Sequence, residues 1–290
     1  MENFIISTET TCDLSSQTLS DLDVSAISME YSVGGEIFGG DSKNTISNKD
    51  FYAKMRKGAK THTSMINDER AKNYLLSLLS RNTDVLHISF ASVCSGTCDA
   101  FLRASKEINA TSKNKVYVVD SKCESTAQGL LVKLCAEKRK SGASLSETKE
   151  YCEAVLSKIN SLFTVDNLKY LEAGGRISKS TAIIGNVLSV KPILYVDETG
   201  KLTQGGKVIS RKLSLSKLAK LTSEKFSGEC NQICVSHADC TIDCNFVVKK
   251  LQSLLPSAQI FTEEIGPVIG AHSGPSTIAV FFVGKDRSFS

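Results

Sequence analysis

Short apolar runs that end in small or hydroxyl-bearing residues recur along the first half of the chain. Residues 3–7 (NFIIS), 85–90 (VLHISF) and 115–119 (KVYVV) are rich in the apolar and β-branched residues of buried strands. Each run is followed by a polar turn and then by a helical pattern, and this alternation continues to about residue 160. The order strand, turn, helix predicts a parallel sheet with helices on both faces.

The pattern changes after residue 160. Val190–Val196 and Lys201–Gln204 flank the four residues DETG, which predict a hairpin. Further strands are expected at 232–236, 259–263 and 277–283, with helices at about 212–226 and 243–254 between them. We therefore expect an α/β protein of two domains. Residues 1–160 would carry the parallel sheet, and residues 161–290 a mixed or antiparallel sheet.

Two stretches of the first half interrupt the alternation. Apolar residues at 27, 29, 31 and 33 alternate with polar or small ones and predict one strand. Residues 58–65 (GAKTHTSM) show no periodicity and carry several hydroxyl groups, so they predict a loop.

Composition and charge narrow the function classes. The 290 residues are 41% hydrophobic and 23% charged, with a net charge of +4, which is ordinary for a globular protein and too small to indicate nucleic-acid binding. No apolar run is long enough for a membrane span, and the N-terminus does not resemble a signal peptide, so we expect a cytoplasmic protein. Ten cysteines occur without a Cys-x-x-Cys pair or zinc-site spacing, which predicts buried thiols and no metal.

Nucleotide-binding motifs are missing from the sequence. No Gly-x-Gly-x-x-Gly follows the first strand, which argues against a dinucleotide site. No Gly-x4-Gly-Lys-Ser/Thr occurs anywhere, so the chain has no P-loop for ATP.

The turn after the second buried strand is the first candidate for a ligand site. Ser95 stands before Gly96-Thr97 at an expected helix start, where unpaired N–H groups favour an anion. A capping serine explains this position equally well, and the motif lacks the first glycine of a hydrolase nucleophile elbow. Thr63 and Ser64 form a second hydroxyl cluster that could converge on the same anion or serve only as turn residues.

Cationic and glycine-rich positions complete the candidates. Arg176 follows Gly174-Gly175, and Arg211 precedes an expected helix; each could instead be a solvated surface residue. Residues 266–276 (GPVIGAHSGPS) surround the single His272 with glycine, proline and small residues. Such a backbone permits close approach to a ligand, so we favour a functional role for His272 over a rigid turn that it merely caps.

Several of these segments together resemble the DegV family of bacterial fatty-acid-binding proteins. The resemblance rests on TETTCDL at 8–14, Thr63-Ser64-Met65, SVCSGT at 92–97, LKYLEAGGRIS at 168–178, VKPI at 190–193 and IGPVIGAHSGP at 265–275. It covers nearly the full length, and the motifs occur in the family's order.

The resemblance implies a two-domain α/β protein that encloses one long-chain fatty acid in a tunnel between its domains. Such proteins are similar to the binding subunit of bacterial fatty acid kinase, which presents the carboxylate to a separate ATP-binding subunit that makes an acyl-phosphate for phospholipid synthesis. By the same resemblance, Thr63 and Ser95 would hold the carboxylate with Ser64 close by. Arg176, Arg211 and His272 would lie near the tunnel mouth and serve the partner or the phosphoryl group. No cofactor beyond the fatty acid is implied.

The chain departs from the family pattern at several positions. Glu9-Thr10 replaces the usual Asp-Ser, which puts a role for that turn in question. Ala91 and Cys94 replace a common Ser and Leu, and Cys98 a common aromatic residue, which could alter the tunnel near the head group. Ser276 stands where glycine is usual. Two other functions remain open at this point: a serine-dependent lipid hydrolase or acyltransferase using Ser95 and His272, and a DNA-binding regulator, against which the modest charge argues.

Overall fold

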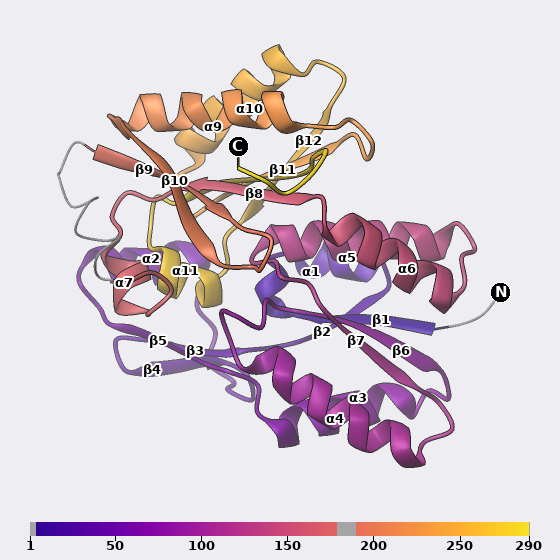
Figure 1. Ribbon diagram of the computed structural model, residues 1–290. Coiled ribbons are helices and arrows are strands. Elements are labelled where there is room, and N and C mark those ends of the chain that lie inside the picture. The colour runs from indigo at the N-terminus through magenta and orange to yellow at the C-terminus, as the bar shows by residue number, and fades with distance from the viewer. Residues whose placement is uncertain (1–3, 179–189, 290) are drawn as a thin grey trace.

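The computed structural model describes residues 4–178 and 190–289. A four-stranded sheet and a six-stranded sheet lie one above the other in Figure 1, and a helix-containing layer separates them on one side. A third, three-stranded sheet adjoins the four-stranded one. The expected α/β fold with a parallel and a mixed sheet is confirmed.

The four-stranded sheet has the order β2-β1-β6-β7, and every pair in it is parallel. Its strands are β1 (Phe4–Glu9), β2 (Val24–Ile27), β6 (Asp84–Ser89) and β7 (Val116–Asp120). All six residues of β1 are buried, as expected for a strand covered on both faces. Asn3, which the sequence pattern placed in the first strand, lies outside the described residues.

Helices cover both faces of this sheet, as the pattern predicted. On one face, α3 (Asp68–Leu79) and α4 (Thr97–Thr111) pack in a cluster with side chains of β1, β6 and β7. On the other face lie α1 (Ser16–Asp21), α5 (Thr126–Lys140) and α6 (Leu145–Leu156). Local signals fix several helix starts, since Ser15, Asn67 and Ser144 accept a backbone N–H at the N-caps of α1, α3 and α6.

The three-stranded sheet corrects two expectations. Its antiparallel strands are β3 (Glu30–Val33), β4 (Glu36–Gly39) and β5 (Thr61–Ser64), and α2 (Asn48–Arg56) precedes β5. The prediction of a loop at 58–65 is wrong, because Thr61–Ser64 pairs with β3 although it holds no apolar residue. The single strand expected at 27–33 is also wrong, since β2 and β3 belong to different sheets.

The six-stranded sheet is mixed, in the order β10-β9-β8-β13-β11-β12, with only β11 and β12 parallel. Its strands are β8 (Ile159–Thr164), β9 (Val190–Val196), β10 (Leu202–Ile209), β11 (Gln232–His237), β12 (Gln259–Glu264) and β13 (Ile278–Val283). The helices of this half are α7 (Lys169–Ala173), α9 (Arg211–Lys225), α10 (Thr241–Leu254) and α11 (Pro267–Ser273). α9 and α10 cover the outer face of the sheet.

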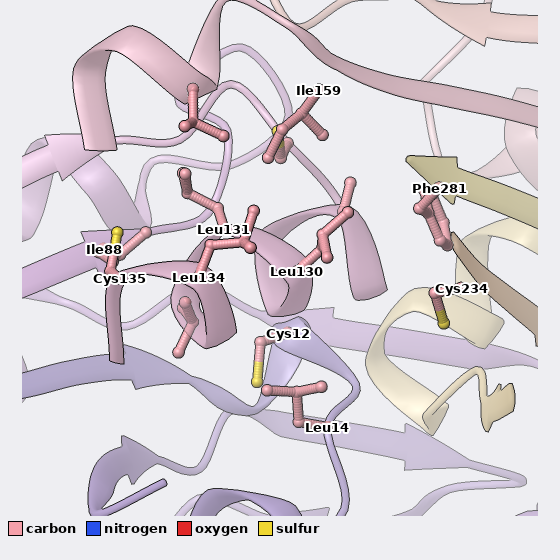
Figure 2. Packing of buried hydrophobic residues seen from close by; sticks show 14 of the residues in the cluster. Cys12, Leu14, Ile88, Leu130, Leu131, Leu134, Cys135, Ile159, Cys234 and Phe281 are labelled. Carbon is pink, nitrogen blue, oxygen red and sulfur yellow. The ribbon is translucent and has the colours of Figure 1, made fainter. Parts of the chain in front are cut away.

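The largest hydrophobic cluster joins the two large sheets through α5. Leu130, Leu131 and Leu134 of α5 are buried between Ile88 of β6 and Phe281 of β13 (Figure 2). Because α5 buries side chains toward both sheets, this packing fixes the carboxyl ends of the parallel strands relative to the inner face of the six-stranded sheet. All ten cysteines are free, and seven of them are buried.

Residues 4–178 and 190–289 contain no helix with the length and apolar character needed to cross a membrane. The same residues contain no group of three or more His, Cys, Asp or Glu side chains placed to hold a metal ion.

Candidate functional site

A cavity of about 290 Å³ lies between the carboxyl edge of the four-stranded sheet, β5, α11 and the inner face of the six-stranded sheet. We refer to it as the inter-sheet cavity. Half of its lining is apolar, as is usual for ligand pockets. These residues are Met29, Met65, Phe90, Phe163, Leu171, Val196, Leu202, Ile265, Val268, Ile269, Ala279 and Phe281.

Four of the six residues singled out in the sequence line the inter-sheet cavity. They are Thr63, Ser95, Arg176 and His272, and they come from β5, the β6–α4 turn, the segment after α7, and α11. The remaining two, Ser64 and Arg211, do not line it. The fold therefore brings together residues that are far apart in the sequence.

Thr63 and His272 are in direct contact. Thr63 Oγ1 lies 2.8 Å from His272 Nε2, while Nδ1 of the same ring has no hydrogen-bond partner among the described residues. Burial, with a smaller contribution from the Arg176 charge, lowers the pKa of His272 to about 4. The imidazole is therefore neutral near pH 7.

Residues Pro267–Ser273 of the glycine-rich run form the helix α11. Gly266 is the N-cap of α11 and Pro267 its first residue, a position at which proline costs no hydrogen bond. His272 lies in the last turn. Its ring packs so closely against Gly174 that a Cβ at residue 174 would overlap Nδ1. Glycine at residue 174 is therefore needed for close contact with the imidazole.

Ser95 is not the N-cap of α4, which is Gly96. Its hydroxyl nevertheless accepts a hydrogen bond from Thr97 N at 3.3 Å and lies 3.0 Å from Thr97 Oγ1. Thr97 Oγ1 also accepts from Ile66 N at 3.2 Å, which ties this turn to the end of β5. Gly96 contacts the Met65 thioether so closely that a Cβ would lie 2.8 Å from its sulfur.

Arg176 connects the Ser95 turn to the glycine loop. Its Nη2 donates to Cys94 O at 2.8 Å, and its Nη1 donates to Gly174 O. Both partners are neutral carbonyl groups, so the positive charge of the guanidinium is not neutralised by these bonds. The cavity wall thus carries a cation beside two hydroxyl groups and a neutral imidazole.

Ser64 and Arg211 are held by other partners. Ser64 Oγ donates to Glu30 Oε1 at 2.8 Å on the exposed side of β5, since alternate residues of a strand face opposite ways. Arg211 donates to Asp243 at 2.8 Å and to Ser276 O at 2.5 Å. Arg211 therefore links α9, α10 and the segment that leads into β13.

Three cavity residues were missed by the sequence reasoning. Ser273 and Ser161 are 7% and 2% exposed, and neither hydroxyl has a partner within the described residues. One carboxyl oxygen of Glu124 is also unpartnered there, and burial raises the pKa of this group to about 8. Ser273 lies in the glycine-rich run, which was a usable signal, whereas nothing in the local sequence distinguished Ser161 or Glu124.

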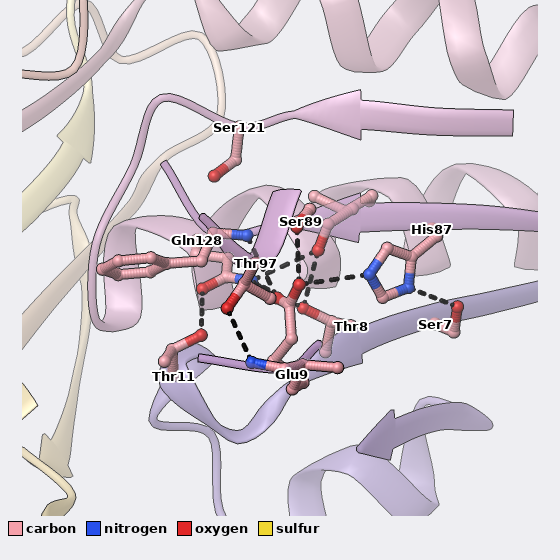
Figure 3. A network of polar contacts seen from close by, with 12 residues as sticks. Ser7, Thr8, Glu9, Thr11, His87, Ser89, Thr97, Ser121 and Gln128 are labelled. Carbon is pink, nitrogen blue, oxygen red and sulfur yellow. Dashed lines mark hydrogen bonds and ion pairs between the residues drawn. The ribbon is translucent and has the colours of Figure 1, made fainter. Parts of the chain in front are cut away.

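Glu9 has a clear structural role. Its carboxylate accepts from Ser89 Oγ at 2.6 Å, Phe90 N at 3.0 Å and Gln128 Nε2 at 2.6 Å, and lies 3.1 Å from His87 Nε2 (Figure 3). All of these groups are buried, and His87 Nδ1 in turn contacts Ser7 Oγ at 2.9 Å. The network holds β1, β6 and α5 together directly before the Ser95 turn.

The other departures from the family pattern fall in different places. Cys94 lines the inter-sheet cavity, but Cys98 is fully buried and does not, so the expectation that it alters the tunnel is not supported by its position. Ser276 adopts a φ of 66°, a left-handed conformation that suits glycine better than serine.

The polar contacts do not form a catalytic triad. A serine hydrolase needs its histidine hydrogen-bonded to the nucleophile and oriented by a third group. Here His272 Nε2 contacts Thr63 rather than Ser95, and no group in the described chain orients Nδ1. A histidine with a pKa of about 4 is also a weak general base at neutral pH.

Comparison with known proteins gives consistent matches over the whole chain. A family model described as an uncharacterised protein of the DegV family matches residues 3–285. A DegV domain-containing protein of Clostridium perfringens is 32% identical over 289 residues, which is 99% of each chain.

Solved structures match as completely. A DegV lipid-binding protein from Thermotoga maritima has a TM-score of 0.82 and 25% identity, covering 99% of this chain and 100% of that one. A stearic acid-binding protein from Eubacterium ventriosum has a TM-score of 0.85 and 22% identity, covering 98% and 99% of the two chains. At that identity the second match shows the fold alone.

Proposed function

Because the chain belongs to the DegV family, we propose that it binds a long-chain fatty acid in the inter-sheet cavity. The observation that carries this proposal is the composition of the cavity wall. Twelve apolar residues line it, and two hydroxyls, an imidazole and a guanidinium gather at one part of it. Burying an acyl chain contributes about 0.8 kcal/mol per CH₂ group, so the polar residues need only orient the carboxylate.

In this proposal Thr63 and Ser95 donate hydrogen bonds to the carboxylate. His272 positions the Thr63 hydroxyl at 2.8 Å, and Arg176 provides positive charge beside the Ser95 turn. Ser64 was expected close by, but its bond to Glu30 directs it away, and we assign it no direct contact. A carboxylate held mainly by hydroxyl groups stays available for reaction.

We further propose that the bound carboxylate is presented to a separate ATP-binding kinase subunit for acyl-phosphate formation in phospholipid synthesis. The chain carries no P-loop of its own, which is consistent with a binding subunit. Arg176, Arg211 and His272 would face the partner or the phosphoryl group. We keep the cytoplasmic location and the division into residues 1–160 and 161–290 as parts of this proposal.

The test of fatty-acid binding is native mass spectrometry of gently purified protein, followed by solvent extraction and titration with added fatty acids. We expect a co-purifying fatty acid, and strongly reduced binding in a Thr63→Ala, Ser95→Ala double variant. Ser64→Ala is the matched control, because it removes the neighbouring hydroxyl on the other face of β5. Ligand-free protein that takes up no fatty acid would refute the proposal.

Kinase presentation needs a separate experiment. The loaded protein is mixed with ATP and a fatty acid kinase catalytic subunit, and acyl-phosphate is trapped with hydroxylamine. We expect product only when both proteins are present, and less of it with Arg176→Ala. If the protein binds fatty acid but no acyl-phosphate forms, kinase presentation is refuted, and the protein is a lipid-binding protein that serves another pathway.

A further inference from the structure

The wall of the inter-sheet cavity contains a polar group where an unsubstituted acyl chain has none. Ser161 is 2% exposed, lines the cavity, and its Oγ has no hydrogen-bond partner in residues 4–178 and 190–289. A buried hydroxyl without a partner bears the full desolvation penalty, so such groups call for an explanation. One explanation is that a ligand atom forms the missing hydrogen bond with Ser161.

Ser161 is surrounded by apolar side chains of neighbouring strands. On one side, Ser161 pairs with Phe281 of β13. On the other side lies the end of β9, where Val196 pairs with Leu202 of β10. Phe281, Val196 and Leu202 all line the cavity. Within this row, Ser161 is the position able to donate a hydrogen bond.

This row lies away from the part of the wall that holds His272. Thr277 Oγ1 donates to Ser273 O at 3.0 Å, which places the start of β13 beside the end of α11. From Thr277 to Phe281 the strand spans about 13 Å, at roughly 3.3 Å per residue. An acyl chain whose carboxylate lies near His272 would therefore pass Ser161 with its middle carbons.

Glu124 is a second unpartnered group of the wall, and it lies between the Ser95 turn and the end of this row. Cys94 Sγ contacts Glu124 Oε1 at 3.5 Å and Gly200 O at 3.8 Å. Gly200 lies in the turn that joins Val196 to Leu202. The other carboxyl oxygen of Glu124 has no partner in the described chain. A ligand hydroxyl both donates and accepts, so it suits a wall that offers a serine and a carboxyl group.

We propose that the preferred ligand is a fatty acid with a hydroxyl group near the middle of its chain, and that Ser161 selects it by hydrogen bonding to that oxygen. This inference rests on the proposed fatty-acid binding. Ser161 is then a specificity residue, distinct from the groups that hold the carboxylate.

The experiment compares stearic acid with hydroxystearic acids that carry the hydroxyl at successive mid-chain carbons, by calorimetric titration of the delipidated full-length protein. We expect at least one hydroxystearic acid to bind roughly fivefold to tenfold more tightly than stearic acid, the ratio given by one net hydrogen bond. In Ser161→Ala that ratio falls to near one. Ser223→Ala, on the exposed side of α9, is the control and keeps it.

The outcomes separate this inference from the function beneath it. If neither acid binds the wild-type protein, fatty-acid binding itself is refuted. If stearic acid and every hydroxystearic acid bind the wild-type protein equally well, Ser161 has another partner such as water, and the inference is overturned. This result needs only the wild-type protein, so it holds even if the variant does not fold. A preference that persists in Ser161→Ala also overturns it.

Discussion

Thr63 and His272, 209 residues apart in the chain, lie with Oγ1 and Nε2 2.8 Å from each other in the wall of the inter-sheet cavity. The contact joins β5, a polar strand of the small sheet, to α11, which precedes the last strand. Since burial keeps the imidazole neutral, its Nε2 can orient the threonine hydroxyl without neutralising a carboxylate. The relationship explains why a strand without apolar residues contributes to a ligand site.

Replacing Thr63 by Val should weaken fatty-acid binding about tenfold while the fold persists. Valine has nearly the shape of threonine but cannot bond to His272 or to a carboxylate, and one charged hydrogen bond is worth about 1.5–3 kcal/mol. Fluorescent fatty-acid displacement measures the affinity, and thermal unfolding monitors the fold. Ser64→Ala should leave affinity unchanged; an equal loss there would mean that β5 as a whole, rather than Thr63, is responsible.

Gly174→Ala should reduce binding through His272. A Cβ at residue 174 would overlap Nδ1, so the imidazole has to move and its contact with Thr63 is lost. Gly206→Ala is the matched control, because no atom of the described residues lies within 4 Å of a Cβ there. We expect about a tenfold loss of affinity for the first variant and little change for the second. Equal affinities of the two variants would show that His272 does not position the Thr63 hydroxyl for the ligand.

The sequence was sufficient for β1, β6 and β7 of the parallel sheet, because these strands carry short apolar runs, but it missed the edge strand β2. It failed for β5, whose residues THTS gain their strand conformation from pairing with β3 rather than from local propensity. Thr63, Ser95, Arg176 and His272 were identified through motifs, and the fold shows that they share one cavity. Ser161 could not be found in this way, because its significance depends on cross-strand neighbours and on the absence of a partner in the described chain.

Glu9→Gln should destabilise the protein by about 3 kcal/mol. The carboxylate accepts hydrogen bonds from Ser89, Phe90 and Gln128, and an amide of the same size replaces one acceptor oxygen by a donor. If the new NH₂ group takes the place of Oε2, it faces the donors Phe90 N and Gln128 Nε2. If it takes the place of Oε1, Ser89 and His87 have to become acceptors. Urea denaturation of the variant, with the exposed Glu224→Gln as control, measures the loss. A change below about 0.5 kcal/mol, typical of surface substitutions, would show that the network is not needed for stability.

Asp13 should make stability fall as the pH rises from about 4 to 7. Its carboxyl accepts from Ser125 Oγ at 2.6 Å and from Gly266 N at 3.0 Å, and so links the starts of α5 and α11. Burial outweighs these bonds and raises the pKa of Asp13 from 3.8 to about 7. Between these values the folded state binds more protons than the unfolded state, so each rise in pH favours unfolding.

Asp13→Asn isolates this effect. The amide oxygen can still accept from Gly266 N, but the side chain no longer ionises. We therefore expect the variant to gain stability relative to wild type as the pH increases from 4 to 8, measured by urea denaturation at several pH values. Burial raises the pKa of Glu124 to about 8, so this group also makes stability fall as the pH rises. The lowered pKa of His272 makes stability rise with pH between about 4 and 6.5. Wild type and variant contain both groups, so their effects cancel in the stability difference. A difference that is constant with pH would mean that Asp13 stays ionised in the folded protein, held by Ser125 and the N-terminus of α11.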